Sequence, residues 1–260
     1  MVKQKIGIIK IGGAFLEDEK LLETFYSAFA SMEGLKVLVH GGGKRASKLS
    51  IDLGITPQMV HGRRITDAKS LEVVTMVYAG WANKTLVAGL QGRGCNALGL
   101  SGADANLIRA LKRPASDIDY GLVGDVERVD ADGLSTLLNA GFTPVFCALT
   151  HDGKGQLLNT NADSIAADLA MGLSPLYEVK LVYCFEKQGV LRDVSDPESV
   201  IPRIDPDHFK TLQKEGAISE GMIPKLFNSF RALQAGVDQV YIGPVSLLSG
   251  QAPKSTQIHL

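Results

Sequence analysis

The chain has 260 residues, of which 45% are hydrophobic and 21% are charged, and its formal net charge is -1. This is the composition of an ordinary globular protein, and the near-zero charge excludes a surface built to bind nucleic acid. The three cysteines, Cys95, Cys147 and Cys184, are far apart and form no Cys-x-x-Cys pair, which excludes a disulfide framework and a structural zinc site.

Short apolar runs alternate along the chain with longer amphipathic stretches. Buried strands are predicted at 6–11, 36–39, 96–100, 144–148, 180–184 and 237–242. Helices are predicted at 49–53, 71–90, 135–140, 163–171 and 224–235. A polar loop at 112–121, a strand at 122–129 and an irregular, proline-containing connection at 195–208 interrupt the alternation. This order predicts an α/β fold, a three-layer αβα sandwich with a central, mostly parallel sheet.

The sequence predicts neither a signal peptide nor a membrane-spanning segment. The first ten residues hold no apolar segment of signal-peptide length. The charge-free stretch 133–150 contains Asn139, Gly141 and Pro144, so it is interpreted as helix, turn and buried strand. We therefore expect a cytoplasmic protein with no membrane partner, folded as a single domain over 1–260 with two lobes, 1–174 and 175–260.

The first predicted strand ends in Lys10-Ile11-Gly12-Gly13. Two glycines let the backbone turn sharply and approach a ligand closely. The lysine would lie at the carboxyl edge of the sheet, where open α/β folds bind ligands, and could face a phosphoryl group. Taken alone, the motif favours the alternative interpretation, an exposed lysine before a tight turn.

The second strand is followed by His40-Gly41-Gly42-Gly43, before a helix predicted to begin near Lys44. Consecutive glycines expose backbone N–H groups at a helix N-terminus, which favours an anion. A flexible turn is the alternative. Neither GxxxxGK[ST] nor GxGxxG occurs, so the two glycine loops indicate a phosphate cradle of another kind.

Three later motifs carry polar side chains to predicted helix starts. Arg64, in Gly62-Arg63-Arg64-Ile65-Thr66, could grip a carboxylate with two hydrogen bonds, or simply be a solvated charge. In Asn159-Thr160-Asn161-Ala162-Asp163, Asn161 suits a helix cap and Asp163 the first turn, so capping alone explains both. The functional alternative is that Asn159 binds substrate and Asp163 orients nearby lysines.

The last motif is Gly221-Met222-Ile223-Pro224-Lys225, at the start of the final long helix. Pro224 fits the first turn of a helix. Lys225 lies in the same turn, where the helix dipole disfavours a cation. This local conflict indicates a functional placement, although a surface lysine could accept the small penalty.

Taken together, these motifs resemble the amino acid kinase superfamily and, within it, the acetylglutamate kinases of arginine biosynthesis. The resemblance runs from residue 5 to about 245 and includes Asn83-Lys84-Thr85. It implies the amino acid kinase (carbamate kinase-like) fold, with an acylglutamate-binding lobe at 1–174 and a nucleotide-binding lobe at 175–260. It also implies ATP-dependent phosphorylation of the γ-carboxylate of N-acetyl-L-glutamate, with Mg²⁺ arriving bound to ATP and no metal site of the protein's own.

The resemblance also implies roles for individual residues. Lys10 and Lys225 would stabilise the transferring phosphoryl group, and Asp163 would order them. Arg64, Asn159, Gly42 and Gly43 would bind the substrate, and Gly12, Gly13 and Gly42 the phosphates. The nucleotide would contact Glu186, Gly189, Val190, Leu191, Ala217, Ile218 and Ser219.

One segment departs from the family pattern. Acetylglutamate kinases usually carry Thr/Ser-Asp-Val-x-Gly-Val where this chain has Phe185-Glu186-Lys187-Gln188-Gly189-Val190. Glu186 replaces the aspartate and Lys187 replaces an apolar residue. Nucleotide contacts in this loop are therefore the part of the resemblance that this sequence supports least.

Other functions remain open from the sequence. The His40 loop and Gly99-Leu100-Ser101-Gly102-Ala103 together approximate an esterase oxyanion loop and nucleophile elbow, but Ala103 stands where a glycine belongs. The altered 185–188 loop would suit a non-catalytic nucleotide or amino-acid sensor, although both lysines are retained. Another small carboxylate kinase of the superfamily is a further alternative. N-succinyl-L-glutamate is the alternative substrate.

The resemblance finally bears on assembly. Arginine-regulated relatives carry an extra N-terminal helix that links dimers into a hexamer, and Lys10 lies too near Met1 to leave room for it. We expect a homodimer, formed through the helix at 67–90, that arginine does not inhibit.

Overall fold

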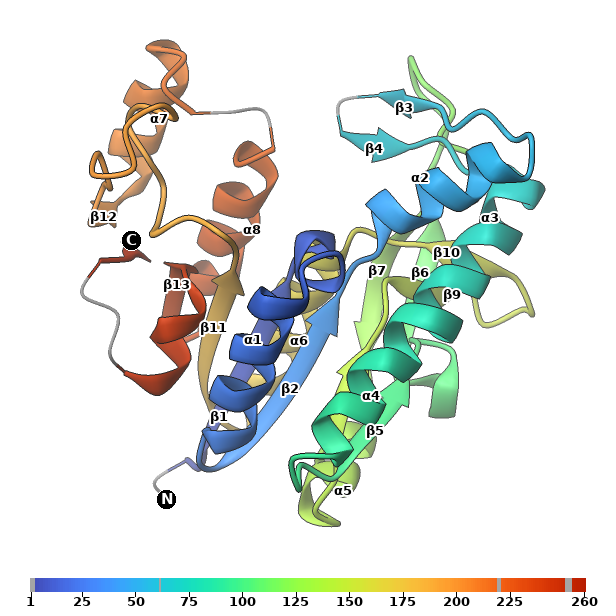
Figure 1. Cartoon of the computed structure of the whole chain (residues 1–260), viewed down its shortest axis with the longest axis horizontal. Coiled ribbons are helices and arrows are strands. Elements are labelled where there is room, and N and C mark those ends of the chain that lie inside the picture. The colour runs from blue at the N-terminus through green and yellow to red at the C-terminus, as the bar shows by residue number, and fades with distance from the viewer. Residues whose placement is uncertain (1–2, 61, 219–220, 251–253) are drawn as a thin grey trace. The chain divides into compact units, whose positions relative to one another are not determined.

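The computed structural model describes residues 3–60, 62–218, 221–250 and 254–260 (Figure 1). The chain forms two compact units. The first unit comprises Met1–Lys36 together with Ala166–Leu260, and the second comprises Val37–Ile165. The predicted substrate and nucleotide lobes, 1–174 and 175–260, concern ligand binding and stay a prediction.

The first unit is built on a mostly parallel sheet. Its strands are β1 (Lys5–Ile11), β11 (Glu178–Cys184), β12 (Arg203–Ile204), β13 (Gln239–Gly243) and β14 (Thr256–Ile258), in the order β12-β14-β13-β11-β1. Strand β11 pairs in parallel with both β1 and β13, whereas β14 runs antiparallel to β13. Strands β1, β11 and β13 therefore end at one edge of the sheet.

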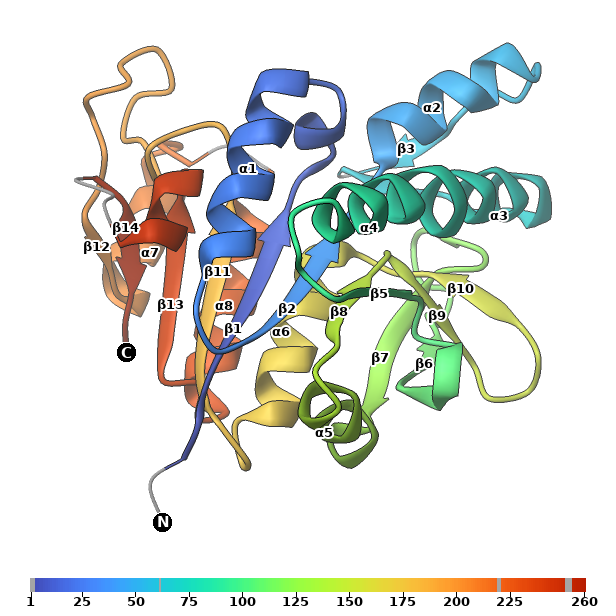
Figure 2. The ribbon, with the colours of Figure 1, turned by 60° about the horizontal axis from the view of Figure 1, so that its bottom comes forward.

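Helices cover both faces of this sheet. They are α1 (Glu19–Ser31), α6 (Ala162–Leu173), α7 (Pro206–Lys214) and α8 (Ile223–Gln234), with short 3-10 turns η1 (Gly13–Leu16) and η4 (Val245–Ser249). Figures 1 and 2 show α1 on one side of β1 and β11, and α6 and α8 on the other. The strands are continuous apolar runs because both of their faces are buried: Ile8, Ile9 and Ile11 of β1 are inaccessible to solvent.

A buried lysine, Lys36, binds carbonyl groups at the C-terminal end of α1. Lys36 donates hydrogen bonds to the carbonyl oxygens of Phe29, Ala30 and Met32 at 2.8, 3.0 and 2.7 Å. These carbonyls lie in the last turn of the helix, where the ammonium group adds a donor; the Phe29 oxygen also accepts from the Met32 N–H at 3.3 Å. A cation there also complements the helix dipole.

The second unit contains strands of three sheets. Strands β2 (Leu35–His40), β8 (Thr143–Phe146) and β5 (Ala97–Leu100) are parallel. Strands β10 (Leu157–Asn159), β9 (Leu149–His151), β6 (Ile108–Lys112) and β7 (Gly124–Val129) form a second sheet in that order, and β3 (Met59–Val60) pairs with β4 (Arg63–Arg64).

One long helix of the second unit has an irregular centre. Helix α3 (Ala68–Thr75) continues through a π-helical segment, η2 (Met76–Ala82), into α4 (Asn83–Gln91). The remaining helices are α2 (Gly43–Asp52), α5 (Ala131–Asn139) and the 3-10 turn η3 (Asp104–Asn106). Because π-helical turns occur frequently at functional sites, the side chains that η2 presents are of interest.

The predicted α/β fold with a mostly parallel sheet between helices is confirmed, and each predicted strand and helix is present within a few residues. The 195–208 interpretation is wrong at its end. Asp205 caps α7 by accepting from the N–H groups of Asp207 and His208, and Pro206 starts the helix. Helix α1 was not predicted, although Phe25 and Phe29 recur at helical spacing.

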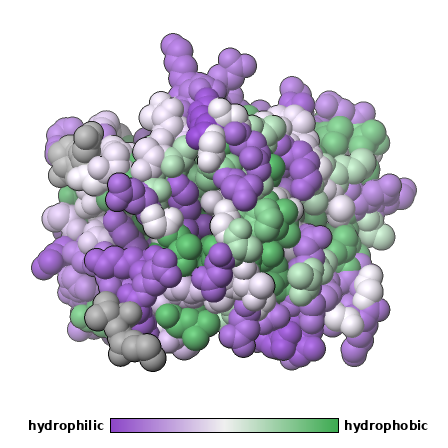
Figure 3. Space-filling model, turned by 90° about the horizontal axis from the view of Figure 1, so that it is seen from below, coloured by the Kyte–Doolittle hydropathy of each residue, from purple (hydrophilic) through white to green (hydrophobic). Residues whose placement is uncertain are grey.

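No helix in the described part of the chain is long and apolar enough to cross a membrane. On the face shown in Figure 3, hydrophilic side chains cover much of the surface and smaller apolar areas lie among them.

Candidate active site

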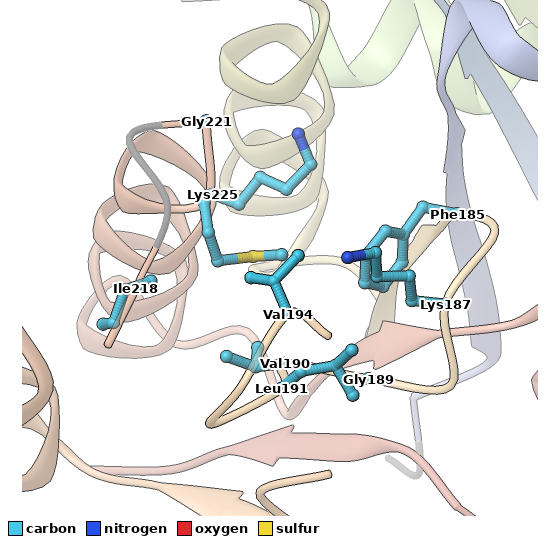
Figure 4. A pocket seen from close by; sticks show the side chains of 10 residues that line it. Phe185, Lys187, Gly189, Val190, Leu191, Val194, Ile218, Gly221 and Lys225 are labelled. Atoms are coloured by element: carbon cyan, nitrogen blue, oxygen red, sulfur yellow. The ribbon is translucent and has the colours of Figure 1, made fainter. Parts of the chain in front are cut away.

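A pocket of about 260 Å³ opens beside the carboxyl end of β11 in the first unit (Figure 4). It is lined by Phe185, Lys187, Gly189, Val190, Leu191, Val194, Ile218, Gly221, Met222 and Lys225. Five of the predicted site residues are thus brought together, namely Gly189, Val190, Leu191, Ile218 and Lys225. Glu186 and Ala217 are not among the lining residues, and Ser219 lies outside the described residues.

Tight packing holds the loop that follows β11. A Cβ atom on Gly189 would lie 2.7 Å from Oγ1 of Thr256 and 2.8 Å from Cγ1 of Val200, so only glycine fits there. The next residue, Val190, donates its N–H to Thr256 Oγ1 at 2.8 Å. The pocket wall therefore has a defined backbone position, which helps a site bind its ligand without a large ordering cost.

The two predicted catalytic lysines both belong to the first unit. Lys10 lies near the carboxyl end of β1, opposite Tyr183 of β11, and is only 7% exposed. Lys225 lies in the first turn of α8, after Pro224, and lines the pocket. Because β1 and β11 are parallel and in register, Lys10 lies at the sheet edge from which the pocket loop leaves.

Gly12, which follows β1, has free space on the side where a Cβ atom would stand. Gly12 precedes the 3-10 turn η1, and a Cβ atom there would meet no atom within 4 Å. Its φ of -78° suits any residue, so neither packing nor conformation requires glycine at this position. An open backbone next to Lys10 suits close approach of a phosphate group.

Cys184 ends β11 beneath this site. Burial raises its pKa to about 12, although the positive charges of Lys180 and Lys10 oppose the rise. The thiol is therefore neutral near pH 7 and is not a nucleophile.

The second unit carries the other glycine loop. Helix α2 begins at Gly43, and its capping residue Gly42 offers no side chain to the first N–H groups of the helix. His40 is fully buried: its Nδ1–H donates to the Gly41 oxygen at 2.8 Å, which leaves Nε2 to accept from the Asn83 amide at 3.1 Å. The loop is thus anchored from beneath while its N–H groups stay available for an anion.

Arg64 reaches this loop from β4. Its Nη2 donates to the Gly43 oxygen at 3.1 Å and to Ser47 Oγ at 2.7 Å. The side chain is buried, 6% exposed, and its Nε has no hydrogen-bond partner among the residues that the structure describes. A buried guanidinium with an unsatisfied donor is the feature expected of a group that completes its hydrogen bonds with a bound anion.

Tyr78, from the π-helical segment η2, covers both glycines and Arg64. A Cβ atom on Gly42 would lie 2.8 Å from the Tyr78 ring, and one on Gly43 would lie 3.6 Å from its hydroxyl. Burial raises the pKa of Tyr78, and the charge and hydrogen bonding of Arg64 oppose the rise. The phenol therefore stays protonated near pH 7.

A short hydrogen-bonded chain joins Asn159 to Arg64. The Asn159 amide donates to Thr66 Oγ1 at 3.0 Å, and Thr66 Oγ1 donates to the Arg64 oxygen at 3.1 Å. The structure thus brings together two predicted substrate-binding residues that are far apart in the sequence.

Asp163 lies in the first turn of α6 and is buried. Asn161 caps this helix, as predicted, by accepting from the N–H groups of Asp163 and Ser164 at 2.8 and 3.1 Å. The helix cap is therefore Asn161. Capping does not explain the acidic side chain at position 163.

The esterase alternative has no support in the geometry. Ser101 donates its hydroxyl to Asp104 at 2.8 Å, and no histidine in the described part of the chain bonds it. A nucleophilic serine needs a histidine base within hydrogen-bond reach.

Sequence reasoning missed Ser47, Tyr78 and Lys187 as site residues. Ser47 and Tyr78 carry no motif, because only tertiary contacts place them against Arg64. Lys187 could have been identified from the sequence, since it departs from the family pattern. Among the described residues, no group of three or more His, Cys, Asp or Glu side chains could hold a metal ion.

Comparison with known proteins gives concordant matches. The amino acid kinase family matches residues 5–244. An acetylglutamate kinase from Phocaeicola vulgatus is 56% identical over 95% of this chain and 96% of the relative. One from Bacteroides fragilis is 58% identical over 93% of this chain and 92% of the relative.

Solved structures agree on the fold. The crystal structure of smu.665 from Streptococcus mutans UA159 has a TM-score of 0.78 at 25% identity, over 97% of this chain and 98% of that one. Carbamate kinase from Giardia lamblia bound to AMP-PNP has a TM-score of 0.67 at 14% identity, over 98% of both chains, which shows the fold alone.

Proposed function

Because the chain belongs to the amino acid kinase family, we propose that it transfers the γ-phosphoryl group of ATP to the γ-carboxylate of N-acetyl-L-glutamate. The products are N-acetyl-L-glutamyl 5-phosphate and ADP, and the reaction is a step of arginine biosynthesis. The observation that carries the proposal is the 56–58% identity to acetylglutamate kinases over more than nine-tenths of both chains.

The chemistry fits the residues at hand. A carboxylate oxygen of the substrate forms a bond to the γ-phosphorus while the bond from that phosphorus to the β–γ bridging oxygen breaks, and its electron pair leaves with ADP. The attacking carboxylate is already ionised near pH 7, so no general base is needed. Catalysis then rests on positioning and on stabilising charge in the transition state.

Lys10 and Lys225 supply the positive charge in this proposal. Both lie in the first unit, Lys10 at the sheet edge beside Gly12 and Lys225 in the wall of the pocket. The pocket between 185 and 225 binds the nucleotide, with Val190, Leu191 and Ile218 as apolar contacts. Mg²⁺ would arrive bound to ATP and would supply positive charge to its phosphates.

The second unit holds the acylglutamate. Arg64 grips a carboxylate through its unsatisfied donor, and Gly42 and Gly43 offer backbone N–H groups. Asn159 adds an amide whose position Thr66 fixes. In this proposal Asp163, in the first turn of α6, orders the two lysines electrostatically.

We further propose a cytoplasmic homodimer, formed through the helix that runs from α3 to α4. Two large apolar side chains on it, Met76 and Trp81, are 47% and 39% exposed. Apolar surface of this kind is stabilised by burial against a second copy. Light scattering of the full chain tests this, and a monomer at micromolar concentration would count against it.

The function is tested by measuring ADP release from ATP with N-acetyl-L-glutamate, and by trapping the acyl phosphate with hydroxylamine. Lys225→Ala should lower kcat by about 10²–10³-fold with an unchanged melting temperature. Lys214→Ala, an exposed lysine on α7, is the control.

Two outcomes would overturn parts of this proposal. If no ADP is released over a wide range of ATP concentrations, the protein is not a kinase, and the non-catalytic sensor is the favoured function. A higher kcat/KM for N-succinyl-L-glutamate than for N-acetyl-L-glutamate would overturn the proposal that the acyl group is acetyl. The proposal that the protein is a carboxylate kinase would still stand.

A further inference from the structure

In the loop after β11, Lys187 stands where the acetylglutamate kinase pattern has an apolar residue, so this position gains a positive charge. The structure places this lysine in the lining of the pocket, together with Lys225. Figure 4 shows the two side chains reaching into the pocket from different segments, the loop after β11 and the start of α8. We infer that Lys187 binds the phosphate chain of the nucleotide and sets the affinity for ATP and ADP, an inference that rests on the proposed function of this pocket.

The first argument is the absence of any competing partner. No hydrogen bond or ion pair joins Lys187 to another residue in the ranges that the structure describes. Two other exposed lysines of the first unit are paired, Lys210 with Asp207 and Lys254 with Glu198. An ammonium group that lines a cavity and has no protein partner is available to an anionic ligand.

The second argument is the division of the pocket into apolar and cationic parts. Val190, Leu191, Val194 and Met222 are apolar, and among the lining residues that the structure describes the charged side chains are those of Lys187 and Lys225. An apolar wall favours a base and sugar, whereas two ammonium groups favour a polyanion. A nucleoside polyphosphate combines both, which an uncharged metabolite or a free amino acid does not.

The third argument concerns position. Gly189 and Val190, directly after Lys187, are held in place by contacts with Thr256. The lysine therefore projects from a loop whose end is fixed, so binding costs less conformational entropy than it would on a free loop. The side chain is exposed in the absence of ligand, so solvent screening keeps its contribution modest.

The proposal is tested by calorimetric titration of the full chain with ADP, AMP and adenosine, with no acylglutamate present. Lys187→Met should weaken ADP binding about fivefold, AMP less and adenosine not at all, because only the charged part of the ligand loses a contact. The loss should shrink in 0.5 M salt, where the Debye length is only about 4–5 Å. Lys187→Arg should retain ADP affinity.

The matched control is Lys214→Met, which removes an exposed lysine of the same unit that does not line the pocket. Equal losses for adenosine and ADP, or unchanged ADP affinity, would overturn the assignment, as would a wild-type chain that does not bind ADP. Because these titrations contain no acylglutamate, failure to phosphorylate N-acetyl-L-glutamate would be a separate result.

Discussion

Gly42→Ala should destabilise the second unit by forcing a methyl group against Tyr78. The added Cβ would lie 2.8 Å from Cδ1 and 3.0 Å from Cε1 of the ring, well inside the contact distance of about 3.5–4.0 Å between carbon atoms. Tyr78 is 7% exposed, so its ring cannot move aside without disturbing its neighbours, including Arg64.

Overpacking of this kind costs about 1–3 kcal/mol. For a chain of this size the melting temperature should then fall by about 2–12 °C. Thermal unfolding followed by circular dichroism measures this fall. Gly41→Ala is the matched control, because a Cβ there meets no atom within 4 Å, and it should change stability by no more than about 0.5 kcal/mol.

A double-mutant cycle then isolates the cause. Tyr78→Leu removes the ring that the new methyl group meets, so Gly42→Ala should cost much less in that background than in the wild type. If the two costs simply add, the clash with Tyr78 is not the reason and the argument fails. The same cycle read by the KM for N-acetyl-L-glutamate reports whether the glycine loop moves with the ring.

Four further outcomes are expected. Lys36→Met should cost about 1–3 kcal/mol in urea unfolding, since it removes the donor that the oxygens of Phe29, Ala30 and Met32 share at the end of α1; an unchanged midpoint would contradict this. Asn83→Leu should cost a similar amount of about 1–3 kcal/mol, because it strips donors from the β8 backbone and the buried imidazole; Asn83→Gln serves as the polar comparison. Arg64→Lys should raise the KM for acylglutamate and leave the KM for ATP unchanged, because a lysine lacks the planar fork; an effect confined to ATP would count against the assigned role. Asp67 caps α3 by accepting from the Ser70 N–H, which lowers its pKa. Its stabilising effect should therefore be full above about pH 4 and decline as pH falls further, so the difference between wild type and Asp67→Ala should be larger at pH 7 than at pH 2.

Much of the fold could be predicted because it depends on local pattern. A continuous apolar run such as β1 must be buried on both faces, and the glycine loops that follow β1 and β2 stand where parallel strands end. Asn161 was predicted as a cap because its side chain bonds only to residues two and three positions further on.

The charged residues of the candidate site could be predicted from the sequence. The residues that hold them in position could not. Arg64 and Asn159 belong to motifs, but the chain through Thr66 that joins them crosses between distant segments. Tyr78 depends on the π-helical turn of η2, which shifts the side chains that follow and leaves no mark in the apolar periodicity.

By itself, the sequence determined the class of fold, the family and the identity of the charged groups, since each rests on residue type at short spacing. Only the tertiary structure decided that Tyr78 would cover the glycine loop, that the unsatisfied donor of Arg64 would be buried, and that Lys187 would line the pocket beside Lys225. The physical reason is that close packing couples residues through space, and a periodic pattern along the chain records burial without recording the partner.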